Sequence, residues 1–161
     1  MPKLENLKIL CSVYVPDIVC VTESWLDGDI TDTEIAIQGY SAIRLDRNRH
    51  GGGVLIYVRA VFTCSVLFKG SPDFEFIVIS LLCSTRGTNP DLTIALFYRP
   101  PNSNPSLLDS LFSALCSLDV YVFLSFYLIG DFNIDFLCTY SPFYNKILSV
   151  VPSFISFTNC I

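Results

Sequence analysis

The stretch from Tyr121 to Asp135, YVFLSFYLIGDFNID, constrains this chain most, because a nearly continuous apolar run stops there at Gly130. No charge interrupts the run before Asp131, as is typical of a β-strand covered on both faces. Gly130 leaves room for another group to approach its backbone. If the strand stays extended, Asp131 and Asn133 project from one face and the apolar residues alternating with them point inward. We therefore expect a central strand with a polar tip, the place where open α/β sheets bind ligands, although a polar turn closing a strand is the other interpretation.

Length and composition fit one domain. The chain has 161 residues, of which 52% are hydrophobic. Its best apolar run lies between Asp119 and Asp131 and falls short of the roughly 20 residues of a membrane-spanning helix, so no span is expected. The N-terminus lacks the basic start and apolar core of a secretory signal, which argues against secretion. The net charge of −5 argues against a broadly basic nucleic-acid binder, but a local basic loop can still contact phosphates.

The cysteines are odd in number, form no C-x-x-C pair and lie mostly in apolar segments. This pattern predicts buried free thiols of an intracellular protein and argues against a disulfide framework or a zinc site. They are Cys11, Cys20, Cys64, Cys83, Cys116, Cys138 and Cys160.

Hydrophobic periodicity predicts helices at both ends of a series of strands. Leu4, Leu7, Leu10, Cys11 and Tyr14 recur at helical spacing over 3–14. Strands are expected at Ile18–Val21, Tyr40–Leu45, Val54–Arg59, Thr63–Phe68, Phe74–Leu82 and Leu92–Tyr98. Asn104 and Pro105 begin a helix whose apolar face is Leu107, Leu108, Leu111, Phe112 and Leu115. Pro142–Val151 is expected to form a further helix, Phe154–Ile161 a last strand, and Asp27–Gln38 a surface connection.

Three glycines, Gly51 to Gly53, follow the most basic stretch of the chain. Phosphate-binding glycine loops precede a helix, whereas a strand follows here, so the pattern favours a β-hairpin. The basic residues, Arg44, Arg47, Arg49 and His50, form either a solvated turn or a nucleic-acid contact.

Polar residues follow three of the expected strands. Thr22 and Glu23 follow the first, Tyr98 and Arg99 a later one, and Asp131 the apolar run described above. Together they suggest a site at one rim of a sheet. Phosphodiester hydrolysis suits such a site, because Mg²⁺ prefers carboxylate oxygens and a second carboxylate can orient a water for in-line attack. Glu23 is then the candidate ligand and Asp131 the candidate base.

Four segments in this order, PDIVCVTESWL, RLDRNRHGGGVLIYVR, FYRPPNS and LIGDFNID, resemble the endonuclease/exonuclease/phosphatase superfamily. Within it they most resemble the endonuclease domains of LINE-type non-LTR retrotransposons, and the similarity runs from about Lys3 to Ile161. The resemblance implies an α/β chain with a two-sheet, four-layer sandwich and outer helices, here one partial domain over 1–161. It also implies a hydrolase that nicks DNA with Mg²⁺, or Mn²⁺ in its place, ahead of reverse transcription.

Site residues carry over position by position. Glu23 matches the metal-binding glutamate, Tyr98 the tyrosine near the scissile phosphate, Asp131 the aspartate that orients the attacking water, and Asn133 the asparagine that holds the phosphate in the transition state. Asn102 aligns with a polar neighbour of the tyrosine. The weaker substrate-binding candidates are Asn102, Arg99, Arg49 and His50.

The chain also departs from the family pattern. Members begin with a strand that carries an asparagine near the metal, and they end with strands that supply an aspartate and an Asp-His pair. Here Asp135 is the last acidic residue and His50 the only histidine. We therefore expect an incomplete sandwich with impaired activity, exposed sheet edges, poor solubility and self-association through those edges.

Two further functions stay open. One is a phosphatase of the same superfamily acting on a small substrate, and the other is a catalytically inactive remnant that binds nucleic acid or a protein. The basic glycine loop and the YRPPN segment favour the retrotransposon branch. That branch implies DNA as partner, no membrane, and an intracellular, nuclear location.

Overall fold

The computed structural model describes residues 2–82, 92–118 and 125–134. These residues contain two helices and seven strands, and the strands form two sheets. In chain order they are α1 (Pro2–Tyr14), β1 (Ile18–Thr22), β2 (Tyr40–Leu45), β3 (Val54–Arg59), β4 (Thr63–Ser71), β5 (Phe74–Leu82), β6 (Leu92–Tyr98), α2 (Ser106–Ser117) and β7 (Phe126–Asp131).

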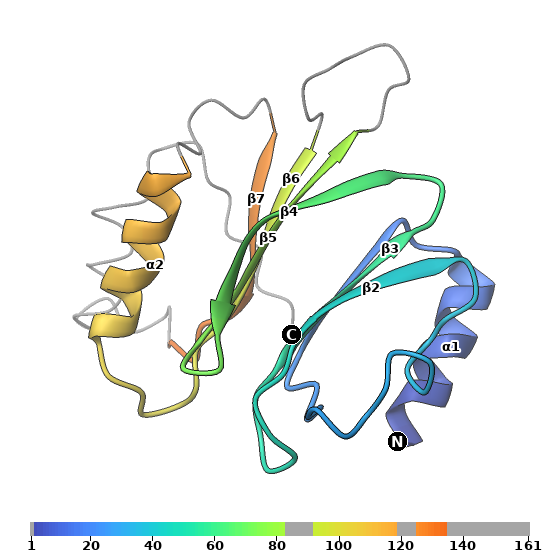
Figure 1. Ribbon diagram of the computed structural model, residues 1–161, viewed down its shortest axis with the longest axis horizontal. Coiled ribbons are helices and arrows are strands. Elements are labelled where there is room, and N and C mark those ends of the chain that lie inside the picture. Colours follow the sequence, from blue (N-terminus) through green and yellow to red (C-terminus); the bar gives the residue numbers. More distant parts are fainter. Residues whose placement is uncertain (1, 83–91, 119–124, 135–161) are drawn as a thin grey trace.

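The three-stranded sheet has the order β1-β3-β2, and the four-stranded sheet has the order β4-β5-β6-β7. All neighbours are antiparallel except β6 and β7, which run parallel. The sheets face each other, with α1 outside the first and α2 outside the second (Figure 1). The predicted two-sheet α/β sandwich with outer helices is therefore confirmed.

The alternation of side chains along β3, β5 and β6 builds this layering, since successive residues of a strand point to opposite faces. One face of each strand lies between the sheets, in a buried cluster that contains Val54, Ile56, Val58, Ile77, Ile79, Leu81, Ile94, Leu96 and Tyr98. The opposite face of β5 and β6 packs against α2, through Phe76, Val78, Ala95, Phe97, Leu108, Leu111, Phe112 and Leu115. Leu55 and Tyr57, on the other face of β3, pack with Cys11 of α1.

Most predicted elements have the predicted bounds. The strands β2, β3, β5 and β6 agree with the expected ranges, β1 is one residue longer, and β4 continues to Ser71. The helix predicted after Asn104 is α2, and the Asn104 Oδ1 atom accepts a hydrogen bond of 2.9 Å from the backbone N–H of Ser106. The glycine stretch lies in a β2–β3 hairpin, as predicted. The elements expected at 142–151 and 154–161 lie outside the described residues.

The prediction of a strand covered on both faces is wrong for β7. This strand ends the order of the four-stranded sheet, and Tyr127 and Ile129 are 57% and 39% exposed. Phe126 and Leu128, on the alternate face, pack into the α2 cluster. One face of β7 is thus partly buried against the α2 cluster, and the face with Tyr127 and Ile129 is exposed.

Two smaller expectations also need correction. Leu10 and Tyr14, assigned to the apolar face of α1, are 50% and 75% exposed, because the helix meets the sheet mainly through Cys11 and its neighbours one turn earlier. The connection over 27–38 is not only a surface segment, since Ile35 and Ile37 are buried in the same cluster.

The cysteines that the structure describes are free thiols, as expected, but they are not all buried: Cys11 is buried, Cys20 and Cys64 are half-buried, and Cys116 is exposed. Cys83, Cys138 and Cys160 lie outside the described residues. Among the residues described, no helix is long and apolar enough to cross a membrane.

Candidate active site

The polar ends of β1, β6 and β7 meet in the folded chain. Tyr98, at the end of β6, pairs in register with Asp131 at the end of parallel β7. The Tyr98 hydroxyl also donates a hydrogen bond to Oε1 of Glu23, which follows β1 in the other sheet. Tyr98 is only 2% exposed, so this bond lies at the end of the core between the sheets. The single tyrosine therefore connects the two acidic strand ends that the sequence singled out.

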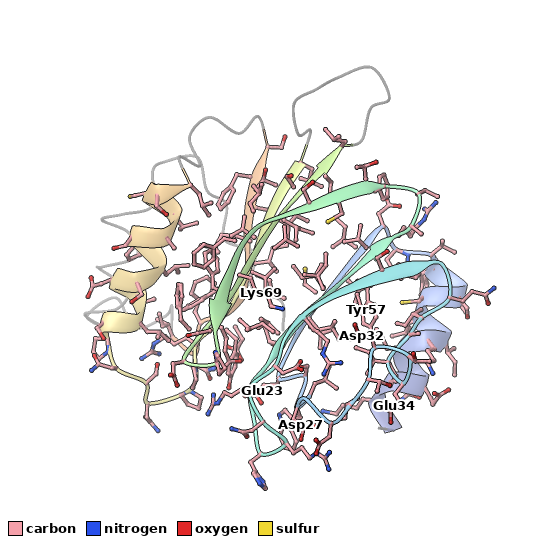
Figure 2. All side chains as sticks on the ribbon, in the orientation of Figure 1. Glu23, Asp27, Asp32, Glu34, Tyr57 and Lys69 are labelled. Carbon is pink, nitrogen blue, oxygen red and sulfur yellow. The ribbon has the colours of Figure 1, made fainter. Side chains whose placement is uncertain are left out.

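Three donors fix the carboxylate of Glu23. Besides Tyr98 on Oε1, the indole Nε1–H of Trp25 and the backbone N–H of Gly52 donate to Oε2, the latter over 2.9 Å. Glu23 and Trp25 hold positive φ angles of 56° and 54°, a conformation that costs a non-glycine residue about 1–3 kcal/mol. Backbone bonds from Ser24 N–H to Gly53 O and from Trp25 N–H to Gly52 O hold the strained segment against the hairpin. Figure 2 shows Glu23 above the loop between β2 and β3.

The donor chemistry of Glu23 fits a hard divalent cation. A carboxylate has about four lone-pair positions, and three are used by the bonds above, so one oxygen position remains for a metal ion. Mg²⁺ is commonly bound through one or two carboxylates, with waters and substrate phosphates completing its shell. In residues 2–82, 92–118 and 125–134 no group of three or more His, Cys, Asp or Glu side chains clusters as a metal site. Glu23 alone is not such a cluster, and it stays a candidate ligand on the chemistry of its free oxygen position.

The hairpin glycines are needed because the loop packs directly on neighbouring side chains. A Cβ atom on Gly52 would lie 2.7 Å from Oε1 of Glu75, and one on Gly53 would lie 2.4 Å from Oγ of Ser24. Both glycines also have positive φ angles, 76° and 86°. The loop is a hairpin, as predicted, and its successive N–H groups bind Glu23 and Glu75.

Glu75 is a buried residue of this region that sequence reasoning missed. It is 2% exposed on β5, accepts a bond from Gly53 N–H, and pairs with Nη1 of Arg47 at 3.0 Å. Burial raises the pKa of its carboxyl, and Arg47 and Gly53 oppose that rise. A signal was present: Glu75 shares the odd-numbered face of β5 with Ile77 and Ile79, so the strand alternation places it between the sheets.

Asp131 and Asn133 form a compact tip after β7. Asn133 has a φ of 48°, so the extended backbone that we expected does not continue past Asp131. Its backbone N–H donates to Oδ1 of Asp131 over 3.0 Å, and its Nδ2 donates to the carbonyl of Arg99 over 2.8 Å. Asp131 and Asn133 are exposed, and Phe132 is buried, as the alternation predicted.

Arg99 holds this tip from inside. Only 3% exposed, its guanidinium donates to the carbonyls of Phe132, Asn133 and Ser103 over 3.2–3.3 Å. Desolvation lowers its pKa. Arg99 and Asn133 therefore bind each other reciprocally, each side chain to the other's backbone carbonyl. Asn102 lies exposed in the turn after β6, with a φ of 60°.

Gly130 permits the close pairing of β7 with β6. A Cβ atom on Gly130 would lie 1.8 Å from the carbonyl oxygen of Phe97, so only glycine fits here. The sequence predicted a close approach at this glycine, and the approaching group is the neighbouring strand. The pairing Phe97–Gly130 immediately precedes the pairing Tyr98–Asp131.

The basic loop is largely neutralised by carboxylates. Arg49 pairs with Asp27 and with Asp29, the latter at 3.1 Å, while Arg47 pairs with Glu75. Arg44 pairs with Asp32 and Asp46 and binds the carbonyls of Asp27 and Ile30. His50 is exposed, and its backbone N–H donates to the Asn48 side chain. Arg44 and Arg49 therefore organise the acidic loop over 27–38. Figure 2 labels Asp27, Asp32 and Glu34 of this loop.

Neither the family models nor the curated proteins searched match this chain. Solved structures do match it in fold. A structure of an endonuclease/exonuclease/phosphatase family protein from Bacteroides thetaiotaomicron aligns with a TM-score of 0.60 and 17% identity, over 92% of this chain and 58% of that one. ANGEL2, described as a 2′,3′-cyclic phosphatase in complex with adenosine-2′,3′-vanadate, aligns with a TM-score of 0.59 and 18% identity, over 89% and 46%.

D. rerio TDP2, solved with a single-stranded DNA product, aligns with a TM-score of 0.58 and 12% identity, over 94% of this chain and 59% of that one. The chain thus spans about half the length of these structures. At such identities the likeness establishes the fold, and the order and layering of the two sheets agree with it.

Proposed function

From its endonuclease/exonuclease/phosphatase fold, we propose that this chain hydrolyses phosphodiester bonds of nucleic acid with a divalent metal ion. One observation carries the proposal: Tyr98 joins Glu23 of one sheet to the β7 end of the other, beside Asp131. This contact supports a metal ligand and a base acting together at one rim of the sheets. The neighbouring structures with a cyclic adenosine phosphate analogue and with a DNA product support a nucleotide substrate.

Each residue has a defined part in this proposal. Glu23 would hold Mg²⁺, which polarises a phosphoryl oxygen when bound. Tyr98 keeps Glu23 in place through its hydroxyl. The backbone N–H of Asn133 donates a hydrogen bond to Oδ1 of Asp131, which leaves Oδ2 to act as the base. In the proposed step Oδ2 accepts a proton from a water, the water oxygen bonds to phosphorus, and the bond from phosphorus to the leaving oxygen breaks. Asn133 itself is anchored to Arg99, which fixes the direction of that carboxylate.

The finer proposal is a DNA endonuclease of LINE type that acts in the nucleus, and the order of the four sequence segments supports it. Mn²⁺ would replace Mg²⁺ without a change of ligands, since both accept oxygen donors. Asn102, Arg49 and His50 stay candidates for substrate contacts, with the charge of Arg49 already paired to Asp27. Arg99, the fourth candidate from the sequence, is buried and donates to backbone carbonyls, so in this proposal it supports the tip after β7 instead of contacting substrate.

A substrate panel tests the proposal. Supercoiled plasmid, a phosphoinositide and a 2′,3′-cyclic nucleotide are incubated with the purified chain, with Mg²⁺ and with EDTA. We expect plasmid nicking that requires the metal, and a loss of roughly 10²-fold or more in Glu23→Gln. Glu5→Gln is the matched control, because Glu5 is an exposed residue of α1 that pairs with Lys8, and it should leave the rate unchanged.

The panel separates the alternatives. Phosphate release from the phosphoinositide without nicking would assign the chain to small-substrate phosphatases. A folded protein that acts on none of the three substrates in Mg²⁺ would refute hydrolysis and leave a non-catalytic binding role.

A further inference from the structure

Trp25 combines an exposed indole ring with a backbone conformation that bulky residues rarely adopt. The side chain is 52% exposed, yet it sits on a backbone with a positive φ of 54°, which is a genuine outlier for a bulky residue. Its Nε1–H donates to Glu23 Oε2, and its backbone N–H donates to Gly52 O over 2.9 Å. Both ends of the residue are thus held, while much of the ring surface faces solvent.

Single exposed apolar residues are common and need no explanation. Trp25 differs because the fold strains its backbone to present it, and strain of this kind concentrates at binding and active sites. The anchor of the ring is also the candidate metal ligand, Glu23. A group bound at Glu23 therefore lies next to the ring.

On the basis of the proposed function, we propose that the exposed face of Trp25 is a stacking platform for a base of the nucleic-acid substrate. In a nucleotide one sugar joins base and phosphate, so a phosphodiester held at Glu23 brings a base within reach of a ring bonded to the same carboxylate. Aromatic faces stack on any base, which gives binding without sequence readout.

The surrounding charges favour stacking over phosphate neutralisation. Arg47 and Arg49, two arginines of the adjoining β2–β3 loop, already pair with Glu75 and with Asp27. Few phosphate charges are then neutralised on binding, so the affinity should change little with salt. We expect a slope of log K against log salt of magnitude about 1, compared with about 6–10 for proteins that make many phosphate contacts.

The fluorescence of the chain gives a direct test, because Trp25 is its only tryptophan. A single-stranded thymidine octamer is titrated in Mg²⁺ into the Asp131→Asn protein, which keeps the Glu23 carboxylate and should cleave slowly, and an abasic octamer with the same phosphates is the control. Saturable quenching by the thymidine octamer, with at least about 5-fold weaker binding of the abasic one, supports the platform. No quenching, or equal quenching by both, overturns it.

Variants then separate stacking from the support of Glu23. Trp25→Phe keeps a ring and loses the N–H, whereas Trp25→Leu loses both. With a dye-labelled octamer, Trp25→Leu should bind roughly 5- to 150-fold more weakly and Trp25→Phe close to wild type. In the nicking assay Trp25→Phe should lower kcat more than it raises KM, since Glu23 loses one donor. Equal weakening in both variants would overturn the proposal.

The two proposals fail separately. Nicking without base-dependent quenching would refute the platform and keep the hydrolase. Base-dependent quenching without nicking would refute the hydrolase and keep the platform. Thermal unfolding of each variant confirms that a loss of binding is not a loss of fold.

Discussion

The pair of Arg47 and Glu75 should respond very unequally to removal of either partner. The Glu75 side chain is 2% exposed, whereas that of Arg47 is 33% exposed. If Glu75→Gln removes the buried charge, Arg47 can reach water and the amide oxygen can still accept a bond from Gly53 N–H. If Arg47→Met removes the exposed partner and keeps its aliphatic stem, an unpaired carboxylate stays buried.

The cost of Arg47→Met has a ceiling set by protonation. Burial already raises the pKa of Glu75 from its ordinary value of 4.5, and loss of Arg47 raises it further. A carboxyl with a raised pKa contributes its full stability below its unfolded pKa, and loses it as the pH rises through its folded pKa. Keeping it neutral at pH 7 costs at most about 3.4 kcal/mol, at about 1.4 kcal/mol for each pH unit.

Urea unfolding between pH 4.5 and pH 7 measures this. Arg47→Met should destabilise the protein at pH 7 by less than the ceiling of about 3.4 kcal/mol, because burial already raises the pKa of Glu75 in the wild-type protein, and the cost should fall towards zero near pH 4.5. Glu75→Gln should cost less than about 1 kcal/mol at pH 7. Arg49→Met, which removes an arginine that is 56% exposed, is the control and should stay within about 1 kcal/mol. A pH-independent cost of Arg47→Met, or an equal cost of Glu75→Gln, would refute the reasoning.

Two further predictions concern a glycine and the thiols. Gly130→Ala brings a Cβ to 1.8 Å from the carbonyl oxygen of Phe97, so it should lower the free energy of unfolding, measured in urea, by about 1–3 kcal/mol and should slow nicking. Gly28→Ala is the control, because a Cβ there meets no atom within 4 Å, and it should change neither quantity. Burial raises the pKa of Cys20 to about 11, so at pH 8 Cys20 should react with a thiol reagent far more slowly than the exposed Cys116. Peptide mapping after a short exposure to the reagent measures the labelling of each cysteine, and equal labelling would contradict the prediction.

The secondary structure was readable from the sequence because alternation and turn residues are local signals. The strands from Tyr40–Leu45 to Leu92–Tyr98 emerged with nearly their final bounds for this reason. The position of β7 in its sheet was not readable in the same way. An apolar run looks the same in the sequence whether its strand is covered on one face or on both. The exposure of Tyr127 depends on the place of β7 at the end of the strand order, which is set by contacts between distant segments.

The site was predictable as a set of strand ends but not as a bonded network. The polar residues after β1, β6 and β7 were visible, and the resemblance gave their order. The bond from Tyr98 to Glu23 joins residues 75 positions apart, and no local pattern encodes it. The charge pairs were also hidden: a basic stretch was evident, but its neutralisation by Glu75 and Asp27 depends on how distant segments pack.

The central claim is that Asp131, placed beside Tyr98 by the parallel pairing of β6 and β7, serves a hydrolytic site. The most direct measurement is the rate at which Asp131→Asn converts supercoiled plasmid to the open circle in Mg²⁺, relative to the wild-type chain and to Asp29→Asn on the exposed acidic loop. We predict a loss of roughly 10²- to 10⁴-fold for Asp131→Asn and none for Asp29→Asn. Equal rates in all three proteins would contradict the account.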